Sequence, residues 1–288
     1  MAKSYDRTRG DTGNIVALEH VNVTIPDQRP ATLFYLVGLG FTRDPYLMPG
    51  LDNMWVNVGR SQCHLPAGNP MRLRGTIGVV VPNLGELAQR LTHVAPLLAD
   101  TEFSFKTHAD RIEATCPWGN RFRCHAPGPA FGATDLALAY VEFDVPRGTA
   151  DGIARFYREA LRAPAVTEQR GGDAVARVDA GASQQLLFRE TGGALPPYDG
   201  HHIQIYLADF SGPHRLLAAR GLITEESNEQ QYRFRDIVDL SSGEPLFTIE
   251  HEVRSLRHPL YARPLVNRNP AQTNADYVRG HDAFRGTY

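Results

Sequence analysis

Two histidines stand at the start of matching stretches of this sequence. His20 opens "HVNVTIPD" at residues 20–27, and His202 opens "HIQIYLAD" at 202–209, which is 182 residues further along the chain. Each stretch alternates in polarity like a half-buried β-strand and ends in a turn. Neutral imidazole is a good ligand for divalent transition metals, but a metal site needs several such groups from different strands. The two imidazoles can share one metal only if the fold brings their strands together.

The same strand pattern recurs four times at a nearly constant interval. The copies begin at residues 20, 76, 140 and 202, which gives intervals of 56, 64 and 62 residues. Each copy is followed by a helical pattern and then by two or three short strands. We therefore predict four β-α-β-β-β modules. Since one module has a sheet face that it cannot bury alone, we expect the modules to pair around two pockets.

This arrangement resembles the vicinal oxygen chelate superfamily, which includes glyoxalase I, methylmalonyl-CoA epimerase, the fosfomycin and bleomycin resistance proteins and the extradiol ring-cleavage dioxygenases. The resemblance covers roughly residues 15–260, and its carriers are "EHVNVTIPD", "HHIQIYLAD", "CPWGNRFRC" and "FTIEHEV". It implies an α+β fold in which four βαβββ modules form two half-open β-barrels. The chain then divides into a polar N-terminal tail (1–14), modules 1 and 2 (15–132), modules 3 and 4 (133–262) and a C-terminal extension (263–288).

The resemblance implies metal ligands at two places in each module, which are the head of the first strand and the last strand. The first place holds His20, Thr76, Tyr140 and His202. The second place holds His64, Arg123, Leu186 and Glu250. Only modules 1 and 4 offer side chains that bind a divalent cation well. These side chains converge only if module 1 pairs with module 4, so we predict this pairing, with module 2 paired with module 3.

The carboxylate ligand has two candidates in the stretch "TIEHEV". Glu250 and Glu252 share one face of the last strand, and His251 points to the other face, because successive side chains of a strand alternate. The resemblance places the ligand directly after "FTI", which selects Glu250.

Two metal geometries remain open. If His20, His64, His202 and Glu250 all bind the metal, about two octahedral positions stay free, which suits Lewis-acid catalysis by a glyoxalase- or epimerase-type isomerase or a lyase. If His64 is not a ligand, the other three form a 2-His-1-carboxylate triad, which suits Fe(II), O₂ and a catechol-like substrate. His64 would then be a second-sphere acid–base catalyst, as the resemblance to extradiol dioxygenases implies. Tyr232 is the nearest match to the catalytic Tyr of those enzymes.

We therefore expect a metal-dependent enzyme and favour an extradiol-type ring-cleavage dioxygenase that uses Fe(II). The alternatives are an isomerase or lyase that uses Mn, Ni, Co or Zn, and a non-catalytic small-molecule binder of the resistance type. The ordinary charge balance, with a net charge of −2 and a pI near 6.6, speaks against a nucleic-acid partner.

The remaining sequence features concern environment and partners. No apolar run approaches the 18 or so residues of a membrane span, and the polar N-terminus has no signal-peptide pattern. Three cysteines without a CxxC pair suit a reduced, cytoplasmic protein. We expect a small-molecule substrate, no membrane partner, and a homodimer as an open alternative to the monomer.

Overall fold

The computed structural model describes residues 5–46, 52–266, 269 and 271–278, and the four predicted modules are found within them. Module 1 has β1 (Ile15–Asn22), α1 (Gln28–Ala31) with a π-helical continuation (Thr32–Gly38), β2 (Thr42–Arg43), β3 (Asn53–Val58) and β4 (Ser61–Pro66). Module 2 has β5 (Gly75–Val80), α2 (Leu84–Val94), β6 (Ser104–Thr107), β7 (Arg111–Thr115) and β8 (Arg121–His125). Module 3 has β9 (Ala137–Pro146), α3 (Ala150–Glu159), β10 (Ala165–Arg170), β11 (Asp173–Asp179) and β12 (Gln185–Thr191). Module 4 has β13 (His202–Leu207), α4 (Ser211–Ala219), β14 (Ile223–Asn228), β15 (Gln231–Val238) and β16 (Pro245–Ser255). None of the described helices is long and apolar enough to cross a membrane.

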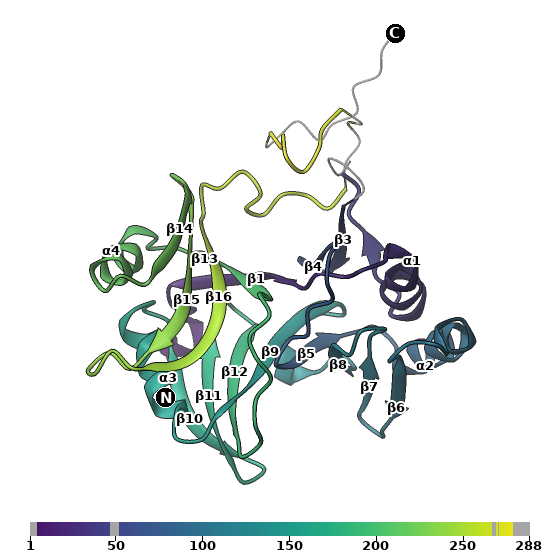
Figure 1. The fold of residues 1–288 in the computed structure, drawn as a ribbon, viewed down its shortest axis with the longest axis horizontal. Coiled ribbons are helices and arrows are strands. Elements are labelled where there is room, and N and C mark those ends of the chain that lie inside the picture. Colours follow the sequence, from purple (N-terminus) through teal and green to yellow (C-terminus); the bar gives the residue numbers. More distant parts are fainter. Residues whose placement is uncertain (1–4, 47–51, 267–268, 270, 279–288) are drawn as a thin grey trace.

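The modules pair as predicted, the first with the fourth and the second with the third. One eight-stranded sheet has the order β14-β15-β16-β13-β1-β4-β3-β2, and the other has the order β10-β11-β12-β9-β5-β8-β7-β6. At the centre of the first sheet β1 runs antiparallel to β13, from Ile15 opposite Leu207 to Asn22 opposite His202 (Figure 1). Each pair of modules therefore forms a half-open barrel in an α+β fold. The first barrel combines module 1 with module 4, which are far apart in the sequence.

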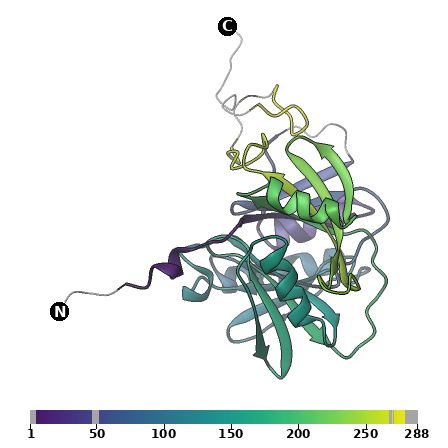
Figure 2. The same ribbon diagram turned by 90° about the vertical axis from the view of Figure 1, so that its left-hand side faces the viewer.

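The helix of module 3 links the two sheets. Along α3, Ile153, Phe156 and Tyr157 are fully buried, at the three- and four-residue spacing that gives a helix one apolar face. The Tyr157 ring lies 5.4 Å from Phe188 of β12, and its hydroxyl lies 2.6 Å from Nε2 of His251 in β16. Burying each large apolar side chain contributes about 1.5–3 kcal/mol. Figure 2 shows modules 3 (teal) and 4 (green) as neighbouring layers.

The alternation along β16 separates core from site. Ile249, His251 and Val253 are buried, and His251 stacks on Phe234 of β15 with ring centroids 4.2 Å apart. Glu250, Glu252 and Arg254 lie on the opposite face, as the period of two requires. The prediction that His251 faces away from the site is confirmed.

The C-terminal segment, by which we mean the described residues of 256–278, crosses from β16 towards β3 (Figure 1, yellow). Arg263 forms a buried ion pair with Asp44, whose side chain is 1% exposed. The Tyr46 hydroxyl donates to the carbonyl of Pro264 at 2.8 Å, and the Tyr46 ring packs edge-on against Tyr277 at 5.5 Å. These contacts fix the segment against module 1.

The three cysteines are expected to be unreactive while the protein is folded. Cys63, Cys116 and Cys124 are buried and free, and burial raises the pKa of Cys63 and of Cys124 to about 12. Since the thiolate is the reactive form, the native protein should release almost no colour with Ellman's reagent at pH 8. In guanidinium chloride all three thiols should react. Rapid reaction of even one thiol in the native protein would contradict the buried positions.

Candidate metal centre

Four neighbouring strands at the middle of the first sheet carry the candidate ligands. His20 lies on β1, His64 on β4, His202 on β13 and Glu252 on β16. The parallel pairs β1/β4 and β13/β16 have the same register, because His20 stands opposite Gln62 and His202 stands opposite Glu250. Two residues further on, His64 and Glu252 occupy equivalent positions. The two modules thus present their polar side chains with approximate two-fold symmetry.

The structure brings His20, His202 and Glu252 together. One ligand atom from each of the three lies within 4.8 Å of the others, and Nε2 of His202 is 3.6 Å from Oε2 of Glu252. All three side chains are buried. Glu19, His20 and His64 form a second such group. In the described part of the second sheet no group of this kind occurs.

His20 has one nitrogen committed and one without a partner. Its Nδ1 lies 2.6 Å from Oε2 of Glu19, and because an ionised carboxylate can only accept, Nδ1 carries the proton. The lone pair is then on Nε2, which is buried and has no hydrogen-bond partner. A carboxylate that fixes the far nitrogen is the usual support of a metal-binding histidine.

His64 is held by a different network. Nε2 of Gln62 donates to Asp44 at 2.5 Å and to Asn57 at 2.6 Å, so the Gln62 oxygen faces Nε2 of His64 at 2.9 Å. Nε2 of His64 therefore carries the proton, and Nδ1 has the lone pair. The ring is stacked between His20, with centroids 3.7 Å apart, and Trp55, at 3.8 Å.

The three imidazoles are neutral. Burial is the main cause that lowers the pKa of His20, His64 and His202 well below 6.5. Positive charge on Arg254 and Arg233 adds to the lowering for His20. Neutral imidazole is the form that binds a metal.

Two arginines bind the acidic side chains of the cluster. Arg233 contacts Oε1 of Glu250 at 2.5 Å and also forms an ion pair with Glu252. Arg254 reaches the other oxygen of Glu252 at 2.6 Å through Nη2. The negative charge of Glu252 is therefore balanced within the buried site.

The predicted ligand Glu250 lies at the edge of this cluster. Its Oε1 is 3.7 Å from Nδ1 of His202, but it is not among the three residues that converge. Glu252 takes that place, because the β13/β16 register puts it two positions beyond the residue opposite His202. The period of two had reduced the choice to these two carboxylates, and no sequence signal specifies the register.

The structure does not bring Tyr232 to the cluster. Its ring packs against Phe210 and His214, at 5.0 Å from each, on the side of the sheet that α4 covers. The neighbouring residue Arg233 points to the site instead. Alternation along the strand decides which of the two neighbours faces the site.

The counterpart position in the second sheet is filled by a tyrosine. The Tyr140 hydroxyl lies 2.9 Å from Nε2 of His125 and accepts from Arg123 at 3.3 Å. Gly78 makes room for the Tyr140 ring, because a Cβ there would lie 2.2 Å from it. The place that His20 and His64 have in module 1 is therefore taken by Thr76 and Arg123 in module 2.

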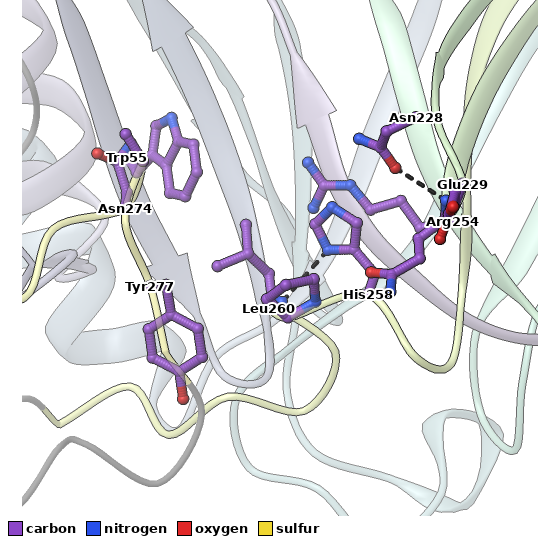
Figure 3. Close-up of a pocket in the computed structure, with 11 residues that line it drawn as sticks. Trp55, Asn228, Glu229, Arg254, His258, Leu260, Asn274 and Tyr277 are labelled. Atoms are coloured by element: carbon purple, nitrogen blue, oxygen red, sulfur yellow. Dashed lines mark hydrogen bonds between the residues drawn. The ribbon is translucent and has the colours of Figure 1, made fainter.

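A pocket of about 630 Å³ adjoins the cluster of candidate ligands, which we call the metal cluster. Figure 3 shows that its wall comes from β3, from the β14–β15 hairpin, from the end of β16 and from the C-terminal segment. The lining includes Trp55, Arg254, His258, Leu260, Asn274 and Tyr277. Trp55 also stacks on His64, and Arg254 also forms an ion pair with Glu252. The pocket is thus one side chain away from the converging ligands, at a size typical of small-molecule sites.

The donor set fits a divalent metal. It offers a buried imidazole nitrogen without a partner, a second neutral imidazole and a carboxylate, all from rigid strands. His20 and His202, the two residues that opened the matching stretches of sequence, are part of it.

Comparison with known proteins supports the fold. No protein-family model and no curated sequence matches the chain. Glyoxalase I from Zea mays superposes with a TM-score of 0.60 at 13% identity, over 83% of this chain and 92% of that one. A "putative dioxygenase" from Bacillus subtilis superposes with a TM-score of 0.58 at 15% identity, over 84% of this chain and 86% of that one. The chain therefore shares its overall fold with these two proteins.

Proposed function

We propose that this protein is a metal-dependent enzyme, and specifically a ring-cleavage dioxygenase for catechol-like substrates. The observation that carries the proposal is the convergence of His20, His202 and Glu252, a 2-His-1-carboxylate set in which Nε2 of His20 has no other partner. This set is typical of non-haem Fe(II) oxygenases. Fe(II) held there would bind O₂ and both oxygens of a vicinal diol, and the diol would supply the electrons that reduce O₂.

The surrounding side chains of this chain then have definite tasks. Glu19 keeps the proton of His20 on Nδ1, and so keeps Nε2 free to bind. Gln62 keeps the proton of His64 on Nε2, which leaves Nδ1 able to accept a proton from a substrate hydroxyl. Trp55 covers the outer face of the His64 ring and shields the site from water.

The second candidate is a Lewis-acid isomerase or lyase of the glyoxalase type. The observation in its favour is the register equivalence of His64 and Glu252, which places four donors at two-fold related positions. If His64 turned its Nδ1 to the metal, the site would have four ligands and about two open positions. Ni, Co, Zn or Mn would serve in that chemistry.

Oxygen uptake separates the two candidates. Protein loaded with Fe(II) without air should consume O₂ when mixed with a panel of catechols in an oxygen-electrode cell. His64→Ala should keep its iron but lose about 10²–10⁴-fold in rate, as expected when a general acid–base group is removed. His93→Ala, which removes an exposed histidine, is the control and should match the unmodified protein.

The opposite pattern would support the isomerase. No oxygen uptake with any diol, together with loss of metal from His64→Ala, would rule out the dioxygenase and identify His64 as a ligand.

A further inference from the structure

The pocket beside the metal cluster has buried hydrogen-bond donors without partners in its wall. Nη1 of Arg254 and Nε1 of Trp55 are both buried and lack a hydrogen bond, while the two side chains are only 7% and 8% exposed. Leaving such donors unpaired is unfavourable. A ligand oxygen that pairs with them would be bound strongly for that reason.

Arg254 has the geometry to bind a carboxylate at this place. Its Nε donates to Gln231 at 2.9 Å, and its Nη2 contacts Glu252 at 2.6 Å. These contacts fix the plane of the guanidinium. Nη1 lies 3.8 Å from Oε2 of Glu19 but makes no hydrogen bond. A planar, fixed guanidinium is well suited to carboxylate recognition. The acidic residue in the lining, Glu229, is exposed, so water and salt screen its charge.

The rest of the pocket suits a flat, apolar body. Trp55, Leu260 and Tyr277 belong to one small apolar cluster with Tyr46. Oδ1 of Asn274 is a buried acceptor without a hydrogen bond, which could accept from a hydroxyl on the ring. In Figure 3 Trp55 and Arg254 lie on opposite sides of the pocket.

We propose that this pocket binds an aromatic carboxylic acid, with its carboxylate on Arg254 and Trp55 and its ring against Leu260 and Tyr277. The inference deepens the proposed function by naming the substrate class, and only the identification of this ligand as the substrate rests on that function. The His258 ring lies beside the Arg254 guanidinium and accepts from the backbone N–H of Leu260 at 3.2 Å (Figure 3), so it would have to turn aside for the carboxylate to reach Nη1. The C-terminal segment would therefore be part of the substrate site.

Binding can be measured without metal. The chain has two tryptophans, so Trp118→Phe leaves Trp55 as the only one. In EDTA-treated Trp118→Phe protein, benzoate should change the Trp55 fluorescence in a saturable way. Benzyl alcohol, which has the same ring without the charge, should bind at least 10-fold more weakly by calorimetry, and inorganic sulfate should not bind measurably.

Two variants test the named donors. Arg254→Met should weaken benzoate binding by about 10- to 100-fold, the scale of a hydrogen bond to a charged group, and leave benzyl alcohol unchanged. Trp55→Phe keeps the ring on His64 but removes the N–H, and should weaken benzoate by about 3- to 10-fold. This variant still tests the proposal if Arg254→Met does not fold. Arg220→Met, which removes an exposed positive charge outside the pocket, should stay within about 3-fold of the unmodified protein.

Equal binding of benzoate and benzyl alcohol, or no binding of either, would overturn the proposal. Because the protein contains no metal in these measurements, such a result would leave the proposed dioxygenase chemistry standing. Conversely, benzoate binding without any oxygen uptake by the Fe(II)-loaded protein would support this pocket and reject the dioxygenase alone.

Discussion

Glu252→Gln should lose most of its bound metal, whereas Glu250→Gln should retain it. Glu252 is the carboxylate that converges with His20 and His202, and an amide cannot replace its charge. Elemental analysis after dialysis against a stoichiometric amount of metal would measure the difference. Glu19→Gln, which weakens the support of His20, should lower metal affinity by about 10–100-fold, and we expect Glu252→Gln to exceed that loss.

Glu250→Gln is the matched control for this experiment. Glu250 shares a face with Glu252 and is also paired with Arg233, so both variants make the same chemical change beside the same arginine. Thermal melts of the two proteins would show whether both remain folded. Metal loss from Glu250→Gln with full metal in Glu252→Gln would show that Glu250 is the ligand, as the family resemblance implied.

Arg263→Met should destabilise the protein by about 3–5 kcal/mol, because it leaves the Asp44 carboxylate buried without its partner. Both side chains are almost completely buried, at 3% and 1% exposure. Asp44 also accepts from Gln62, which holds His64, so the loss should reach the metal cluster. Urea unfolding followed by circular dichroism would give the change in unfolding free energy.

Two further variants check this explanation. Arg162→Met breaks an ion pair with Asp209 in which both side chains are largely exposed, and should cost only about 0–1 kcal/mol. The double variant Asp44→Asn with Arg263→Met should recover part of the loss, since no unpaired charge remains. Equal effects of Arg263→Met and Arg162→Met would show that burial of the pair does not matter.

The repeat in the sequence was enough to predict the four modules, and the candidate metal ligands were enough to predict their pairing. Strand alternation and turn residues are local signals, so the four copies could be found without a structure. The pairing followed from the residues that bind metals, since His20 and His202 are separated by two modules that lack such residues. Both predictions depend on which residue types are present, and side-chain packing does not alter them.

The choice between Glu250 and Glu252 could not be made in this way. It depends on the register of β16 against β13, which is a long-range property of hydrogen bonding between strands. The prediction of Tyr232 as a catalytic residue met a related difficulty, because Arg233 and not Tyr232 is on the site face of β15. The C-terminal segment has no hydrophobic period, so its place over the pocket was visible only in the structure.

The pairing of the first and last modules has a consequence for synthesis of the chain. Modules 2 and 3 are adjacent in sequence, so their sheet can form as soon as residue 191 has emerged. Strand β1 leaves the ribosome long before its neighbour β13 and the candidate ligand on β16, which come 180 or more residues later. At 5–20 residues per second this delay is roughly 10–50 s, during which the β1 edge lies open to other chains. The candidate metal site can therefore be assembled only after β16 has emerged, and a chain that ends before β13 would contain one complete sheet and no such site.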